Sequence, residues 1–380
     1  MSTTTKPPSD LAPRVISNDP ALHEVPNGRE EEWRFTPIKQ IVDFFSPQEW
    51  PSVGAESTRF VTVEPSDTTS GIENATGWQA IDLPSALART YAKQVVRLSI
   101  PADEVVGEVI VVDLTAQQGG NYARVEIEAG AFSKATVVLR HDMTADASGV
   151  IVTHVADQAD LTVLNMYDGP RTSRHVWQWA TTVGRDARFL GLSITLGGAF
   201  VRLQPSVRYA GPGGSAQMLG AFLATDDQFQ EFRLFVDHNE PHCTSNVVFK
   251  GALSGRNAHT VWIGDVLVRR EAVGIETYEM NRNLLLNDGP RADSVPNLEL
   301  ETGDVVGAGH ASATGRFDDE QLFYLQSRGI PEALARQLVV RGFFVDVLDK
   351  VADEHLRLDA LRRIEERIGM QSWNLDEVNP

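Results

Sequence analysis

Two histidines and the only cysteine of the chain gather in one short run, formed by His238, His242 and Cys243. Imidazole and thiolate are ligands that zinc and ferrous iron accept. Three ligands do not close a structural zinc site, however, and on a strand they can point to different faces. We therefore interpret the run chiefly as packing and hydrogen bonding, and we leave open a metal or sulfur role for Cys243.

A second candidate is the lone histidine His310, which ends a long β-rich region and precedes a series of helices. Neutral imidazole can ligate iron, and near neutral pH it can also move protons. The plainer interpretation is a polar side chain that only makes hydrogen bonds within its loop. His310 is a metal-site candidate only if a second chain supplies the other ligands.

Motifs of the common enzyme classes are missing from the sequence. No Gly-Lys-Ser/Thr follows the glycine-rich run 211–214, so we expect neither a phosphate loop nor ATP hydrolysis. Neither a nucleophile elbow nor an HExxH zinc motif is present. We interpret Trp177 and Trp179 as packing on a β-surface rather than as a platform for a flavin or a sugar. These features predict a protein without a catalytic residue of its own.

Composition restricts the partners and the compartment. The chain has 380 residues and a formal net charge of −18, which argues against binding to nucleic acid. A single cysteine excludes an internal disulfide and any all-cysteine cluster site, so the isolated chain is expected to bind no cluster stably. The sequence contains no apolar run of about 18 residues, the length that would predict a membrane span, and the N-terminus lacks a signal-peptide core. A cytoplasmic protein is expected.

The elements that must position these residues fall into four regions. We predict a disordered arm over 1–20, a mixed, partly helical region over 21–95, a β-rich core over 96–315 and a helical region over 316–380. The core consists of short β-branched runs split by Gly, Asp and Asn, with no helices of crossover length between them. A sandwich, a barrel or a parallel β-helix fits this pattern, and the many similar short strands favour the β-helix.

Helix signals are dense after residue 316. Asp318 and Gln321 match a capping box, and Gly329 is expected to end the first helix. Pro331 is expected at the first position of a second helix, which Gly342 would end. A longer amphipathic helix follows. The inward face of the first helix is expected to consist of Leu322, Phe323 and Leu325.

The segment from Gly309 onward, GHASATGRFDDEQLFYLQSRGI, closely resembles the C-terminal signature of the SufB/SufD family, SHGATVGRxDEEQLFYLxSRGI. This family provides the scaffolds of iron–sulfur cluster assembly. Near the N-terminus, 32–37 resembles the family segment DEDWKYTPL. Other matches occur in the family's order at His238, 241–243, 249–251, 283–286, 291–293 and Pro296.

The resemblance implies a mainly β fold, with a right-handed parallel β-helix core flanked by N-terminal and C-terminal α-helical regions. It also indicates the SufD-like branch, because the run 287–293 lacks the cysteine that SufB carries there. His310 matches the histidine of the SHGAT motif. It is therefore expected at the interface with a SufB-like subunit, opposite a cysteine of that subunit, where a nascent iron–sulfur cluster forms.

A second partner implied by the resemblance is a SufC-like ATPase, which would dock on the C-terminal helices. The apolar residues expected in this docking region are Phe323, Tyr324, Phe343 and Phe344. The family complex is also linked to reduced flavin, for which we assign no residues. The alternatives are a β-helix enzyme acting on carbohydrates and a purely structural homodimer, and the chain when alone could pair with a second copy.

Overall fold

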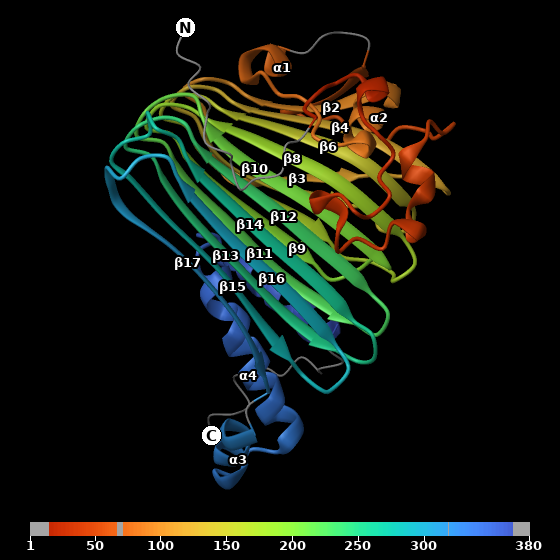
Figure 1. The fold of residues 1–380 in the computed structure, drawn as a ribbon, viewed down its shortest axis with the longest axis vertical. Coiled ribbons are helices and arrows are strands. Elements are labelled where there is room, and N and C mark those ends of the chain that lie inside the picture. Colours follow the sequence, from red (N-terminus) through yellow and green to blue (C-terminus); the bar gives the residue numbers. More distant parts are fainter. Residues whose placement is uncertain (1–14, 67–70, 318, 368–380) are drawn as a thin grey trace, which may run out of the picture.

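The structure is a computed structural model that describes residues 15–66, 71–317 and 319–367. Sixteen consecutive strands, β2 to β17, alternate between two sheets (Figure 1). The strands are β1 (Val61–Pro65), β2 (Gln94–Ile100), β3 (Val105–Leu114), β4 (Gly120–Ala129), β5 (Lys134–His141), β6 (Asp146–Val155), β7 (Asp160–Tyr167), β8 (Arg174–Val183), β9 (Arg188–Thr195), β10 (Phe200–Tyr209), β11 (Ser215–Thr225), β12 (Phe229–His238), β13 (Thr244–Ser254), β14 (His259–Val268), β15 (Ile275–Leu285), β16 (Arg291–Leu300) and β17 (Val305–Arg316).

The two sheets are the opposite walls of one coil. The nine-stranded sheet has the order β1-β2-β4-β6-β8-β10-β12-β14-β16, and the eight-stranded sheet has the order β17-β15-β13-β11-β9-β7-β5-β3. Neighbours are parallel, apart from the antiparallel pair β1 and β2 at one end. Since each strand joins the sheet opposite to its predecessor, the chain forms a β-solenoid of about eight turns over 96–316. The predicted parallel β-helix is confirmed, and its right-handed sense stays a prediction.

The core of the solenoid lies in the lumen between the two sheets. Alternate side chains of each strand point inward, and most of them are apolar. The aromatic rings of Phe222, Phe232 and Phe249 meet across the lumen, with centroids 4.7 and 5.5 Å apart for successive pairs. Trp177 and Trp179 are buried in the same core, which agrees with the packing interpretation of this pair.

One corner of the coil repeats the same tight turn. A residue with positive φ occurs there on successive turns, at Asp103, Phe132, Gln158, Asp186, Gly213, His242 and Gly274. The backbone N–H of each donates to a carbonyl of the next turn, for example Phe132 N to Asp157 O at 3.1 Å and His242 N to Val273 O at 2.9 Å. His242 is therefore a corner residue of the solenoid.

The N-terminal region covers the outer face of the nine-stranded sheet (Figure 1). Its helices are α1 (Gly71–Thr76) and α2 (Leu83–Tyr91), with short 3₁₀ turns at Pro20–Leu22, Glu31–Trp33, Ile38–Gln40 and Val42–Phe45. Buried polar contacts fix it to the sheet: Thr36 donates to Glu231 at 2.6 Å, and Arg202 lies over the ring of Trp33. Residues 1–14 of the predicted disordered arm lie outside the described residues.

The C-terminal helices are α3 (Asp319–Ser327), α4 (Glu332–Leu348) and α5 (Glu354–Arg367). α4 and α5 pack on the outer face of the eight-stranded sheet, and α3 lies beyond the ends of the strands (Figure 1). Gly329 has a φ of +86° directly after α3, so the predicted glycine stop is confirmed. The predicted cap at Asp318 lies outside the described residues, as does the side chain of Gln321.

Two boundary predictions for these helices were wrong. Pro331 is the N-cap of α4 rather than its first helical residue. Gly342 does not end α4, because the helix continues to Leu348 and buries Phe344 and Val347 against the sheet. Packing of this apolar face outweighs the helix-weakening effect of a single glycine, which is about 1 kcal/mol.

Candidate functional site

His310 lies on β17, the last strand of the eight-stranded sheet. Among the described strands only β15 pairs with β17, so the other edge of β17 is open. The register places His310 directly beside Glu279 of β15. The two side chains therefore share one face of the sheet, with His310 Nδ1 at 3.9 Å from Glu279 Oε1. The imidazole is 45% exposed, whereas the carboxylate of Glu279 is 0% exposed.

Glu279 occupies a space that a glycine leaves free on the opposite wall. A Cβ atom on Gly264 of β14 would lie 2.3 Å from Glu279 Oε2, and it would also collide with the Trp262 ring. No side chain among the described residues donates a hydrogen bond to either carboxylate oxygen of Glu279. Burial, reinforced by the negative charge of Asp265 and partly opposed by the backbone N–H of Asn297, raises the pKa of Glu279 to about 9.

The lumen changes from apolar to polar at this end of the solenoid. The inward residues of β15 include Thr277, Glu279, Asn281 and Asn283, whereas their partners one turn earlier, on β13, include Val247 and Phe249. Among them, Asn281 and Asn283 belong to one hydrogen-bonded network, whose other members are Ser294 and Thr314. The last turns therefore fill the lumen with polar side chains, and the partly exposed His310 lies at this end of the coil.

The run from His238 to Cys243 does not assemble a metal site. His238 lies in the lumen and contacts Ser245 Oγ at 2.9 Å, while His242 is exposed at the corner. Cys243 is buried, and burial raises the pKa of its thiol to about 11, so the thiol stays protonated at neutral pH. Over the described part of the chain, no three or more His, Cys, Asp or Glu side chains are grouped so that they could hold a metal ion.

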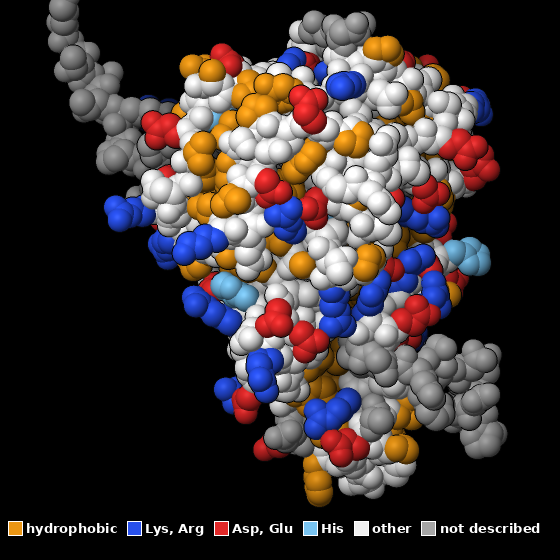
Figure 2. All heavy atoms as spheres, turned by 90° about the vertical axis from the view of Figure 1, so that its right-hand side faces the viewer, with side chains coloured by type: hydrophobic (Ala, Val, Ile, Leu, Met, Phe, Trp, Pro, Cys, Tyr) orange, Lys and Arg blue, Asp and Glu red, His pale blue; other side chains and the backbone are white. Residues whose placement is uncertain are grey.

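The four residues expected to dock the ATPase differ in solvent exposure. Phe323 and Tyr324 of α3 are 71% and 57% exposed, so the predicted inward direction of Phe323 was wrong. Phe344 is fully buried and Phe343 half-buried, and Lys250 of β13 donates to the carbonyl of Phe343 at 2.9 Å. Of the four residues, the two on α3 are therefore the ones that supply accessible apolar surface. Figure 2 shows hydrophobic side chains around the lower extension of the molecule, below a face with charges of both signs.

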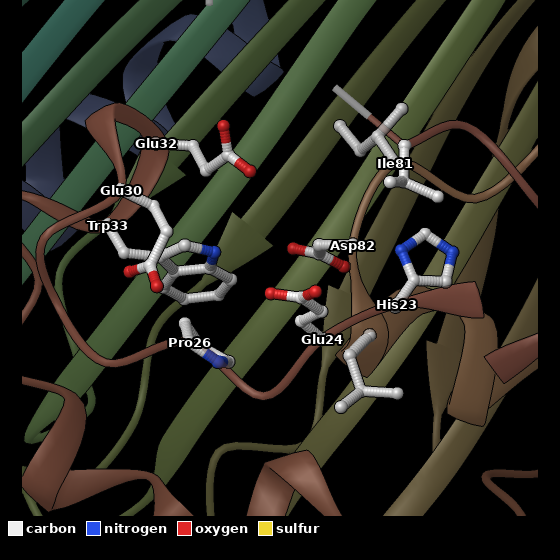
Figure 3. A pocket seen from close by; sticks show the side chains of 10 residues that line it. His23, Glu24, Pro26, Glu30, Glu32, Trp33, Ile81 and Asp82 are labelled. Carbon is white, nitrogen blue, oxygen red and sulfur yellow. The ribbon is translucent and has the colours of Figure 1, made fainter. Parts of the chain in front are cut away.

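A small pocket of about 140 Å³ lies within the N-terminal region, between residues 15–33 and the start of α2 (Figure 3). Several carboxylates face it, among them Glu24, Glu30 and Asp82. Two of these already serve the fold: Asp82 caps α2 by accepting from Ser85 N at 2.9 Å, and Glu30 accepts from the N–H of Gly28 at 2.9 Å. The pocket is therefore bounded by groups that hold the local structure together.

Glu279 is the residue that the sequence interpretation missed. The available signal was the alternation Thr277, Glu279, Asn281, Asn283, which places polar residues at every second position of a strand. Such a pattern predicts a solvated face, and only the pairing of β15 with both neighbours shows that this face points into the lumen.

No helix within 15–66, 71–317 or 319–367 is both long and apolar enough to cross a bilayer.

Together, the fold and the site define a β-solenoid protein that presents polar side chains at the open end of its coil. Residues 112–343 match the family described as SUF system FeS cluster assembly, SufBD core domain. The chain belongs to the SufBD family of iron–sulfur cluster assembly proteins. This membership displaces the alternative of a carbohydrate-active enzyme.

Similar proteins cover nearly the whole chain. An iron–sulfur cluster assembly SufBD family protein of Mycobacterium tuberculosis is 41% identical over 354 residues, covering 90% of this chain and 89% of the relative. One from Mycobacterium leprae is 40% identical over 370 residues, covering 93% of each. The iron–sulfur cluster assembly protein SufD of Escherichia coli is 25% identical over 380 residues, covering 90% of this chain and 89% of that protein.

Proposed function

We propose that this chain is the SufD-like subunit of a SUF scaffold, and that it pairs with a SufB-like subunit and a SufC-like ATPase. The observation that carries the proposal is the position of His310 on the open edge of the last strand. The full-length similarity to SufD of E. coli supports it, as does the absence of a cysteine from 287–293.

The pairing surface in this proposal is the C-terminal end of the solenoid. β16 and β17 end their two sheets there, and Val306 on β17 is 75% exposed. An open edge of unpaired backbone groups readily adds a strand from another chain. When the chain is alone, a second copy is the occupant that would compete for this edge.

The nascent cluster in this proposal forms between the two subunits, as substrate of the complex. Cys243, the one thiol of the chain, is buried and protonated, so it does not supply a thiolate. The partner provides thiolate ligands, and His310 provides an imidazole, which can replace cysteine on iron. The chain itself performs no catalysis, and ATP hydrolysis belongs to the SufC-like partner.

Docking of the ATPase is assigned to α3 in this proposal. Phe323 and Tyr324 lie exposed on one short helix, and Arg328 lies over the Tyr324 ring, 5.2 Å from its centroid. Aromatic residues and arginine are enriched where protein interfaces gain most of their binding energy.

The pairing is tested by co-expression with the SufB-like and SufC-like proteins of the same organism. Val306→Glu places a charge on the proposed interface and is expected to abolish co-purification of the SufB-like subunit. Val42→Glu is the matched control, since Val42 is 61% exposed on the N-terminal layer. Normal pairing of the Val306→Glu variant, with its fold intact, would place the interface elsewhere.

A further inference from the structure

Glu279 is a fully buried acid, and no side chain among the described residues donates a hydrogen bond to its carboxylate. In its ionised form such a group is costly, because burial removes its water and the backbone N–H of Asn297 offsets this only in part. Buried carboxylates of this kind ordinarily pair with a cation or coordinate a metal. Among the described residues, His310 is the basic side chain that lies within ion-pairing distance of Glu279.

The carboxylate is directed toward that histidine and the open end of the lumen. Its Oε2 atom lies against Gly264 on the opposite wall, and its Oε1 atom faces His310 Nδ1. Since the imidazole is 45% exposed, an ion that enters at the end of the coil meets His310 first and Glu279 behind it. The glycine is essential to this arrangement, because any side chain at position 264 would fill the space of the carboxylate.

The separation of the two groups suits a shared ion better than a direct hydrogen bond. At 3.9 Å, Nδ1 and Oε1 are too far apart for a hydrogen bond. Donors about 2.1 Å from one metal lie roughly 3.0–3.4 Å apart in octahedral or tetrahedral geometry, so the two side chains approach each other by about 0.5 Å or more when they share an ion. Imidazole together with carboxylate is a donor set that ferrous iron accepts. The nearby carboxylate of Asp265, which accepts from Asn297 Nδ2 at 2.7 Å, adds negative charge that favours a cation.

We propose that Glu279 and His310 form a mononuclear half-site for ferrous iron at the end of the lumen. With two protein ligands, the ion keeps positions for water and for a donor from a partner chain. Binding is therefore weak and exchangeable, as suits an ion that is passed on as substrate. This half-site rests on the proposed function for the role of His310. It adds to that function a second ligand, Glu279, and an iron ion that binds before any cluster forms.

The test uses Co²⁺ as a spectroscopic probe for Fe²⁺ on the purified full chain. We expect one Co²⁺ per chain, detected by visible absorption and by calorimetry. Glu279→Gln and His310→Ala should each weaken binding about tenfold or more. The double variant should weaken binding by less than the product of the two single effects, because both residues serve one ion. Glu276→Gln, on the outward face of the same strand, and His355→Ala, on α5, are matched controls and should bind as the wild type does.

Folding and site loss are separated by a third variant. Glu279→Asp keeps a carboxyl group but withdraws it from His310, so it should bind with reduced affinity while its thermal unfolding stays cooperative. Absence of Co²⁺ binding by the wild type, or unchanged affinity of Glu279→Gln, would overturn the half-site. The proposed function fails separately: it would be contradicted by normal cluster assembly in a complex that carries His310→Ala, whatever the metal titration shows.

Discussion

The carboxylate of Glu279 and the imidazole of His310 face each other on neighbouring strands, with 3.9 Å between Oε1 and Nδ1. The side chain of Glu279 is buried in the lumen, while that of His310 is partly exposed at the end of the coil. The pair thus connects the polar end of the lumen to the edge at which a partner strand can add. A buried acid in such a place affects stability as well as binding, and both effects are measurable.

Glu279→Gln is expected to stabilise the metal-free protein, increasingly so as the pH rises. In the folded chain the pKa of Glu279 is about 9, compared with 4.5 for a free glutamate, so the unfolded chain loses this proton first. The free energy of unfolding of the wild type therefore falls as the pH rises from about 4.5 to 9. Glutamine cannot ionise and avoids this loss, so the stability difference between the variant and the wild type grows as the pH rises from 5 to 8.

Urea denaturation at pH 5, 6.5 and 8, in the presence of a chelator, measures the effect. The stability difference between Glu279→Gln and the wild type should widen from pH 5 to pH 8, and Glu276→Gln should follow the wild type. Parallel pH profiles for Glu279→Gln and the wild type would mean that Glu279 is ionised in the folded protein.

Buried histidines are expected to destabilise the protein in mild acid. Burial lowers the pKa of His141 to about 3 and that of His175 to about 4, whereas both take up protons near 6.5 in the unfolded chain. The unfolded state thus binds more protons below pH 6.5, and the free energy of unfolding falls by up to about 1.4 kcal/mol per pH unit for each histidine.

His175→Gln removes one of these protonations, although it also loses the contacts of the imidazole with Ala145 O and Trp177 Nε1. The variant should be less stable at pH 7.5 but should lose less stability between pH 6.5 and 5. His355→Gln, at an exposed position of α5, is the control and should keep the wild-type slope. An unchanged slope for His175→Gln would show that this histidine is not buried in its neutral form.

The double variant Phe323→Ala/Tyr324→Ala is expected to weaken binding of the SufC-like ATPase about tenfold or more. Both side chains are exposed on α3, so their truncation should leave the thermal stability of the chain nearly unchanged. Calorimetry with the purified ATPase measures the affinity, and Val42→Ala removes an exposed apolar side chain elsewhere as control. Wild-type affinity of the double variant would remove α3 from the docking site.

The β-rich core was predictable because its signals are local, whereas the choice of a β-helix over a sandwich or a barrel depended on the resemblance to the SufB/SufD family. Short β-branched strands, frequent turn residues and the absence of crossover helices all appear along the sequence, and the strands occur where they were expected. Helix ends were less predictable, since the end of α4 depends on the packing of Phe344 and Val347 against a sheet distant in sequence. The direction of Phe323 depends on α3 lying beyond the strands, which no periodic pattern reveals.

The candidate site was only half predictable for a related reason. His310 could be identified from its resemblance to a family motif. Glu279 has no such motif, and its role arises from the register between β15 and β17 and from Gly264 on the opposite sheet. Register across parallel strands joins residues about 30 positions apart, and one sequence does not specify it.

The most direct test of the proposed function is the cluster yield of the co-expressed complex with His310→Ala. We expect the variant to fold and to pair with the SufB-like subunit, because one side chain rarely decides a large interface. Iron and sulfide content per complex should fall strongly, and His310→Cys should retain part of it, since thiolate also ligates iron. The matched control, His355→Ala, should give the wild-type yield. A wild-type cluster yield from a well-folded His310→Ala complex would contradict the assignment of His310 as the assembly residue of this chain.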